Sequence, residues 1–281
     1  MLSIVLTIHN KEFLLEKVIQ GILKNTVGDF EIIYVLDGCS DKSEVITNKY
    51  LRKNDKLIFS DNVFETKANN VGMKAAQGEF IAIIQDDQII DEYSWNLRIL
   101  RPFSFSDVFA VTSGVAHNWK LTNPSDPCSV DDNEGWSKLL QVTCKASKQT
   151  SNRDVFSVRA SGNRGPLVVN HENLVDLNYL DEVYAPLDMD DHDLAFRARS
   201  QLGKVVGSYW VDVISKLEWG GTRASGETAP WMLEANRKNS RIFVERWETE
   251  IESTSSFIDN RTLKDTASFK NRIARLLKVS Y

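Results

Sequence analysis

The chain has 281 residues, 34 basic and 39 acidic side chains, and a formal net charge of −5. This balance argues against a general nucleic-acid-binding protein, because phosphate contacts need a basic face. The length allows one large domain or two modest ones, with a sizeable core. The three cysteines, Cys39, Cys128 and Cys144, lack metal-binding spacing, which favours free thiols. With no membrane-length apolar run and no signal-type start, a cytoplasmic protein is expected.

Strands and helices alternate in the predicted pattern of the first half. Asn10 is expected to cap a helix whose apolar residues recur at helical spacing over 14–23. Strands are predicted at 3–8, 31–36, 56–60, 80–84 and 108–113, and further helices at 66–76 and 95–103. This alternation specifies an α/β fold with a parallel sheet.

The apolar run over 78–84 leads directly into Gln85 and two adjacent carboxylates, Asp86 and Asp87. Such a run is typical of a strand buried on both faces of a sheet. Ligands of open α/β sheets bind beyond the carboxyl ends of the strands. Two carboxylates there suit Mg²⁺ or Mn²⁺, which complete their coordination with substrate phosphates. We therefore predict a nucleotide-sugar site, with a simple turn at the strand end as the alternative.

The second half has weaker periodicity. Residues 118–164 are polar and too long for an ordinary connection, which favours a lid or substrate-binding segment. Beyond them, strands are predicted at 166–169 and 204–215, and helices at 172–177 and from 188 to a stop at Gly203.

Three carboxylates, Asp190, Asp191 and Asp193, stand where the helix from 188 begins. They could cap free N–H groups and complement the helix dipole, or they could carry chemistry. Asp190 is expected to serve as the cap, which leaves Asp191 free. His192 is interpreted as a solvent-exposed helix residue.

The ordered set of segments resembles the family-2 glycosyltransferases, which have the GT-A fold. The stretch Ser-Ile-Val-Leu-Thr-Ile-His-Asn is similar to that family's first strand, and 30–43 resembles its EIIVVDDGSTD segment, with acids at Asp37 and Asp41. Asn70, Gly72, Gly78 and the strand to Asp87 resemble RNxGxxxAxGEYIxFLDxDD. Arg164-Gly165-Pro166 and the segment from Asp190 to Arg197 are similar to its GP…EDxDLxxR pattern, Trp95 matches a frequent Trp, and 239–247 resembles NxxxFxxKW.

The resemblance implies one GT-A-like, Rossmann-like domain over residues 1–250, with a mostly parallel sheet flanked by helices. Residues 1–115 would form the half that binds the nucleotide sugar. Residues 116–250 would form an acceptor-side α+β portion. Residues 251–281 are predicted to form a C-terminal helical tail.

The resemblance also implies an inverting, metal-dependent hexosyltransferase of polysaccharide biosynthesis. It would move a sugar from a nucleotide-diphosphate sugar to a glycan or glycolipid, with Mn²⁺ or Mg²⁺ as cofactor. Asp87 matches the last acid of the family's DxD motif and receives the metal role. Asp37 would contact the nucleotide base, Asn70 and Asp86 the donor, and Asp191 would be the general base. Gln85 replaces the first DxD acid, so the contact of Asp86 with metal or ribose stays open.

The segment 215–222 departs from the family pattern because it lacks the histidine that often completes the metal site. Glu218 could supply an oxygen ligand, or the site could use two protein ligands and water. Arg223 is expected in a loop over the diphosphate, since arginine pairs bidentately with phosphate oxygens. Several tryptophans could stack on an acceptor sugar, with burial in the core as the alternative for each: Trp119, Trp136, Trp210, Trp219 and Trp231.

The basic run over 264–281 predicts an amphipathic helix. It could contact an anionic membrane that holds lipid-linked acceptors, or pack on the domain or on a partner subunit of a homo-oligomer. Two rival functions stay open. A nucleotidyltransferase would show a glycine-rich basic loop after the first strand, which His9-Asn10-Lys11 is not. A catalytically inactive nucleotide-sugar-binding module is compatible with Gln85 and the missing histidine.

Overall fold

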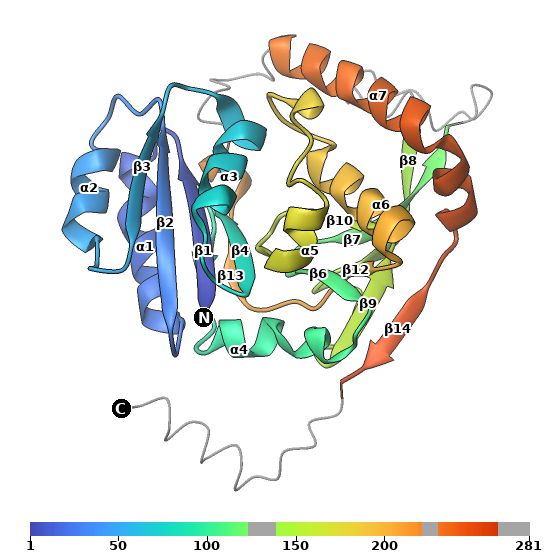
Figure 1. Cartoon of the computed structure of the whole chain (residues 1–281), viewed down its shortest axis with the longest axis horizontal. Helices are drawn as coiled ribbons and strands as arrows, with labels where there is room; N and C mark the ends of the chain where they lie inside the picture. Colours follow the sequence, from blue (N-terminus) through green and yellow to red (C-terminus); the bar gives the residue numbers. More distant parts are fainter. Residues whose placement is uncertain (123–138, 221–229, 264–281) are drawn as a thin grey trace, which may run out of the picture.

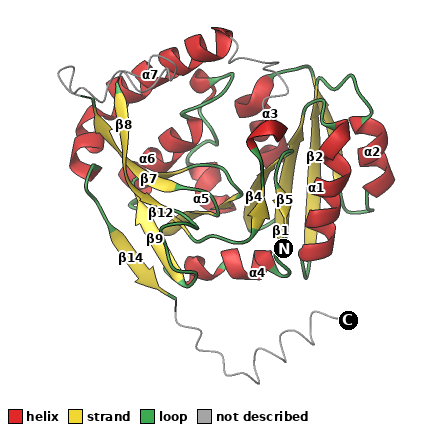
Figure 2. Ribbon diagram, turned by 180° about the vertical axis from the view of Figure 1, so that it is seen from behind, coloured by secondary structure: helices red, strands yellow, loops and turns green. Residues whose placement is uncertain are grey.

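The computed structural model describes residues 1–122, 139–220 and 230–263. Within these ranges the chain is an α/β fold built on a mixed sheet of nine strands (Figures 1 and 2). Their order across the sheet is β14, β9, β12, β6, β11, β4, β1, β2 and β3. In chain order their bounds are Leu2–Ile8 (β1), Phe30–Asp37 (β2), Lys56–Ser60 (β3), Phe80–Gln85 (β4), Val108–Thr112 (β6), Val155–Arg159 (β9), Leu167–Asn170 (β11), Val205–Ser208 (β12) and Asp259–Thr262 (β14). The predicted fold class is confirmed.

Helices cover both faces of this sheet (Figure 1). Their bounds are Glu12–Asn25 (α1), Ser43–Tyr50 (α2), Phe64–Ala75 (α3), Trp95–Ile99 (α4), His171–Asp176 (α5), Asp190–Leu202 (α6) and Pro230–Thr254 (α7). Gly203 ends α6 with a φ of 62°, as predicted for a left-handed cap. The expected cap of α1 is wrong: Lys11 takes that position, and Asn10 Oδ1 instead accepts a hydrogen bond from Ser40 N at 2.7 Å.

The strands β3, β2, β1 and β4 run parallel, so their carboxyl ends meet at one edge. In β4, Ala82 and Ile84 pack into the core on the α1 face, while Ile81 and Ile83 pack into the core on the α3 face. The strand is therefore buried on both faces, as its apolar run predicted. Gly72 lets α3 lie close to the sheet, because a Cβ there would come within 2.4 Å of Val5 Cγ1.

The polar stretch 118–164 is more regular than expected. It contains part of β7 (Ala116–Leu121), then β8 (Leu140–Ala146), β9 and β10 (Ser161–Gly162), and β7 lies between β10 and β8 in a second sheet. Some polar residues of its strands are buried and hydrogen-bonded. Asn118, for example, accepts from Ala160 N at 2.8 Å and donates to the carbonyl of Phe257 at 2.7 Å. Residues 123–138 lie outside the described part.

Two of the predicted elements are each replaced by two shorter elements. The predicted strand over 204–215 is split into β12 and β13 (Val213–Ile214), which pairs with β5 (Ile89–Ile90). The helix expected over 95–103 is α4 followed by a 3-10 turn, η1 (Arg101–Ser104), that contains Pro102. Proline lacks the N–H that a continuing helix would need.

The boundary expected at residue 250 falls inside α7, and the following strand β14 joins the main sheet beside β9. Arg261 fixes this strand by pairing with Asp107 at 2.6 Å. The basic run over 264–281 lies outside the described residues. None of the helices in the described ranges combines the length and apolarity needed to cross a membrane.

Candidate functional site

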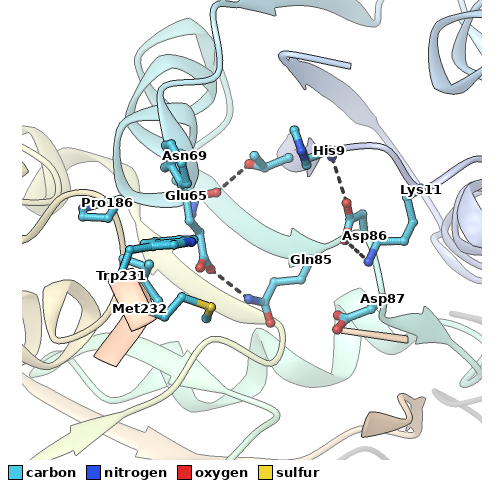
Figure 3. A pocket seen from close by; sticks show the side chains of 13 residues that line it. His9, Lys11, Glu65, Asn69, Gln85, Asp86, Asp87, Pro186, Trp231 and Met232 are labelled. Carbon is cyan, nitrogen blue, oxygen red and sulfur yellow. Dashed lines mark hydrogen bonds and ion pairs between the residues drawn. The ribbon is translucent and has the colours of Figure 1, made fainter. Parts of the chain in front are cut away.

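A cavity of about 190 Å³ opens at the carboxyl ends of β1 and β4 (Figure 3). Its walls come from the end of β1, the first turns of α3, the residues after β4, the loop before α6 and the start of α7. Gln85, Asp86 and Asp87 all line it. The edge of the sheet predicted to hold a ligand is thus the edge that carries this pocket.

Asp86 lies in a cationic environment that the protein itself supplies. Its Oδ2 accepts a hydrogen bond from His9 N at 2.9 Å, and its Oδ1 lies 3.4 Å from Lys11 Nζ. The ammonium group of Lys11 also donates to the carbonyl of Trp219 at 2.7 Å, and its side chain is only 1% exposed. Burial raises the pKa of Asp86 to about 6, although Lys11 and His9 N oppose the shift. Asp86 therefore already has a cation as partner.

Asp87 differs from its neighbour, because its buried Oδ1 has no hydrogen-bond partner among the described residues. Burial raises the pKa of this carboxyl, and Lys11 opposes the shift. Gly220 lies beside it: a Cβ at that glycine would be 3.3 Å from Asp87 Oδ2. An unpartnered carboxylate oxygen facing a pocket is a suitable ligand for a divalent cation.

No group of three His, Cys, Asp or Glu side chains that could hold a metal ion occurs within residues 1–122, 139–220 and 230–263. Mg²⁺ sites typically use one or two protein carboxylates together with substrate phosphates and water. Asp87 with a diphosphate ligand fits that pattern. A dedicated cage of protein ligands does not.

Glu65, on the first turn of α3, lines the pocket and contacts both Gln85 and Arg164. Its Oε1 accepts a hydrogen bond from Gln85 Nε2 at 2.8 Å and lies 3.2 Å from an amino group of Arg164. Arg164 in turn pairs with Asp190 Oδ2 at 2.9 Å. Burial alone would lower the pKa of Arg164, but Asp190 and Glu65 raise it well above its usual value. Glu65 was not predicted from the sequence; the signal that could have indicated it is the amide of Gln85 in place of an acid, since an amide N–H₂ can donate to a nearby carboxylate.

Asp191 lies in the first turn of α6 and is 9% exposed. Its Oδ2 accepts from Arg164 N at 3.1 Å, and its Oδ1 from His192 N at 2.9 Å. Met189, with a left-handed φ of 65°, takes the cap position expected for Asp190. Asp190 still binds a free N–H of the first turn, that of Asp191, at 2.9 Å. Asp191 does not line the 190 Å³ cavity; it contacts the backbone N–H of Arg164, whose side chain contacts Glu65.

His192 is buried, so its interpretation as an exposed residue is wrong. Its Nδ1 lies 3.1 Å from Ser161 Oγ, and its Nε2 lies 3.7 Å from Asp191 Oδ1. The ring packs edge-on against His117 and Trp119, with centroid distances of 5.1 Å for both pairs. The helix α6 is enclosed by β10, β12 and α7, which leaves this face without solvent.

Two predicted donor-binding residues point elsewhere. Asp37 is fully buried, and its carboxylate accepts hydrogen bonds from Val63 N at 2.7 Å and Phe64 N at 2.9 Å, which fixes the start of α3. Asn70 is held by two hydrogen bonds to the backbone of Leu180, at 2.9 and 3.0 Å. Neither lines the cavity. The preceding residue, Asn69, does line it, because adjacent helix residues face different directions (Figure 3).

Of the remaining predicted residues, some line the cavity and others do not. Glu218, in the 3-10 turn η4 (Leu217–Trp219), has a side chain that is 68% exposed, and it pairs with Lys216 at 3.7 Å rather than lining the cavity. Arg223 and Trp136 lie outside the described residues. Trp231 lines the cavity and packs edge-on against Phe64, with ring centroids 5.3 Å apart. Trp119 is buried in the core beneath α7.

A large, mostly parallel sheet with helices on both faces and a pocket at the carboxyl ends of β1 and β4 is the arrangement of a GT-A-like α/β fold, in which ligands bind at that edge. The model of the glycosyl transferase family 2 matches residues 3–167, and the chain belongs to this family of glycosyltransferases.

Two curated relatives illustrate the similarity. An uncharacterized glycosyltransferase of Nostoc sp., alr2836, is 30% identical over 158 residues, which cover 55% of this chain and 48% of that protein. The minor teichoic acid biosynthesis protein GgaB of Bacillus subtilis is 30% identical over 95 residues, which cover 32% of this chain and 11% of GgaB. The matched region therefore spans less than half the length of each relative.

Solved structures share the fold at low sequence identity. The chain is similar to GalNAc-T7, solved with UDP, GalNAc and Mn²⁺, at 14% identity and a TM-score of 0.63, over 90% of this chain and 49% of that one. It is also similar to a mannosyltransferase of Pyrobaculum calidifontis, solved with GDP-Man and Mn²⁺, at 12% identity and a TM-score of 0.55, over 99% and 79% of the two chains. These similarities show the GT-A fold.

Proposed function

We propose that the chain transfers a sugar from a nucleotide-diphosphate sugar to a hydroxyl group of a glycan or glycolipid, with inversion at the anomeric carbon. The observation that carries this proposal is the buried Oδ1 of Asp87 at the carboxyl end of β4, inside a pocket, which has no hydrogen-bond partner within the described part of the chain. Such an oxygen can bind the divalent cation that also binds the diphosphate of a sugar donor. The complexes of similar folds with UDP or GDP-Man and Mn²⁺ support the same site.

In this proposal Asp87 is the protein ligand of Mn²⁺ or Mg²⁺, which would neutralise charge on the leaving diphosphate. Lys11 keeps Asp86 in place and adds a positive charge near the same edge. Asp37 acts indirectly, because it fixes the start of α3. Arg223 is proposed to cover the diphosphate.

Asp191 is proposed as the base that accepts the proton of the acceptor hydroxyl. Two backbone N–H groups orient its carboxylate, at 3.1 and 2.9 Å. Arg164 is proposed to fix the position of Asp191 relative to the donor pocket. Its backbone N–H binds Asp191, and its side chain contacts Asp190 and the cavity residue Glu65. A base on the face opposite the leaving group leads to inversion.

The acceptor is proposed to be a growing polysaccharide or a lipid-linked glycan. One further relative supports this class: a poly(ribitol-phosphate) beta-glucosyltransferase of Bacillus spizizenii, 28% identical over 111 residues, which cover 37% of this chain and 17% of that protein. The similarity to GgaB, a minor teichoic acid biosynthesis protein, supports the same class of acceptor.

The experiment is an activity assay with UDP- and GDP-sugars, with Mn²⁺ or EDTA, and with oligosaccharide acceptors or water. Release of nucleoside diphosphate should require the metal. Nuclear magnetic resonance of the first product should show β-configuration from an α-configured donor. Retained configuration would contradict the role of Asp191, and donor binding without any turnover would favour an inactive binding module.

A further inference from the structure

The position of the transferred sugar follows from the two ends of the proposed reaction. The diphosphate must lie near Asp87, and the acceptor hydroxyl near Asp191, so the sugar ring must lie between them. Glu65 occupies this interval. It contacts Gln85, two residues before Asp87, and it contacts Arg164, whose backbone N–H binds Asp191.

The carboxylate of Glu65 is held firmly, yet it keeps a free acceptor. Gln85 and Arg164 both approach Oε1, while Oε2 accepts no hydrogen bond from the described residues. The side chain is 28% exposed and lines the cavity, and Figure 3 shows it pointing toward the centre, beside Trp231 and Met232. A fixed carboxylate oxygen next to an apolar wall is a suitable acceptor for a sugar hydroxyl.

The charge around Glu65 limits which sugar can bind there. Glu65, Asp190 and Asp191 supply three carboxylates, against the single guanidinium of Arg164. This cluster has an excess of negative charge when its members are ionised. A sugar that carries its own carboxylate would place like charges together in a partly desolvated pocket, which is unfavourable.

We propose that Glu65 is the specificity-determining carboxylate of the donor-sugar subsite: it accepts a hydroxyl of the transferred sugar, takes the place of the acid that Gln85 replaces, and selects neutral sugars over uronic acids. This inference rests on the proposed function. It goes further, because it names the class of donor sugar and a residue on α3 that determines it.

Calorimetry tests this with UDP, UDP-glucose and UDP-glucuronic acid, or with GDP, GDP-mannose and GDP-mannuronic acid if GDP is the nucleotide bound. All titrations use the full chain with Mn²⁺. The neutral sugar nucleotide should bind at least about ten-fold more tightly than the uronic acid form, because the uronic carboxylate would lie close to the carboxylates of Glu65, Asp190 and Asp191.

Glu65→Gln keeps the shape of the side chain and removes its charge. This variant should lower the affinity for the neutral sugar nucleotide about ten-fold and leave the affinity for the free nucleoside diphosphate unchanged. It should also reduce the ratio between the affinities for the neutral and the uronic acid sugar nucleotides. Glu172→Gln is the matched control, because Glu172 is exposed on α5 and does not line the cavity. It should change none of these affinities.

The outcomes separate the two proposals. If no nucleoside diphosphate binds, the donor site itself is wrong and both proposals fall. If the nucleoside diphosphate binds but the wild type accepts the uronic acid form equally well, the role of Glu65 is overturned alone. The same holds if Glu65→Gln has a wild-type melting temperature and an unchanged ratio of sugar-nucleotide to nucleotide affinity.

Discussion

Two carboxylates of this protein, one fully buried and one half-buried, have opposite surroundings. Asp193, on α6, is fully buried and is bound by Arg197 at 2.6 Å, Arg246 at 2.8 Å and Trp247 Nε1 at 2.9 Å. Asp87, after β4, has a buried oxygen without any partner among the described residues. The same residue type therefore stabilises the fold at one place and leaves an unsatisfied acceptor at the other. An unsatisfied buried acceptor costs stability, which a ligand can recover.

Asp191 is the residue where the helix-cap role and the catalytic role give different results. If it is the base, Asp191→Asn should lower turnover by about 10²–10⁴-fold, because a carboxamide cannot take the proton. Donor affinity should stay near wild type, because Asp191 does not line the cavity, and the melting temperature should fall only slightly, because the side-chain oxygen of Asn can still accept one of the two backbone N–H groups that Asp191 binds. Steady-state kinetics and calorimetry on this variant check both points. Wild-type turnover would remove Asp191 from the mechanism.

Asp193→Asn and Asp87→Asn form a matched pair for stability. The first should lower the free energy of unfolding by roughly 3 kcal/mol, because it leaves the guanidinium of Arg197 buried without its charge partner. The second should leave stability unchanged or raise it slightly at neutral pH, because burial raises the pKa of Asp87 and the ionised form is costly there. Urea unfolding of both variants measures the difference. Equal losses would contradict the division between a structural and a ligand-binding carboxylate.

His117 gives a smaller, pH-dependent effect. Burial lowers its pKa well below 6.5, and the neighbouring His192 adds to the shift, so folded His117 stays neutral while the unfolded chain takes up a proton below that pH. This group therefore contributes stability that is present above about pH 6.5 and is lost as the pH falls, by up to about 1.4 kcal/mol per pH unit. His117→Phe should reduce that slope in urea unfolding at pH 5 and pH 7. An unchanged slope would show that His117 can be protonated in the folded protein.

The sequence predicted the regular half of the molecule well, because β1, β2 and β4 are apolar runs that end in polar residues at one edge. The position of Asp86 and Asp87 followed from that pattern alone. Residues 116–162 were harder, since β7 buries the polar side chain of Asn118, whose hydrogen-bond partners are distant in sequence.

The site was predictable only where residues belong to strand ends. Glu65 and Lys11 reach the pocket through the packing of α3 and the loop after β1, and their partners are distant in sequence: Gln85 for Glu65, and Asp86 for Lys11. Asn70 was expected at the donor site, but the orientation of α3 relative to the sheet, which the sequence does not give, places the side chain of Asn69 on the cavity wall and that of Asn70 against Leu180.

The most direct test of the central claim is calorimetric titration of nucleoside diphosphates into wild type and Asp87→Asn, with Mn²⁺ and with EDTA. We predict that one nucleotide binds the wild type much more tightly with Mn²⁺ than with EDTA, and that Asp87→Asn loses most of this gain while its melting temperature is unchanged. Equal affinity in Mn²⁺ and EDTA, or an unchanged metal effect in Asp87→Asn, would contradict the assignment of this pocket as a metal-dependent donor site.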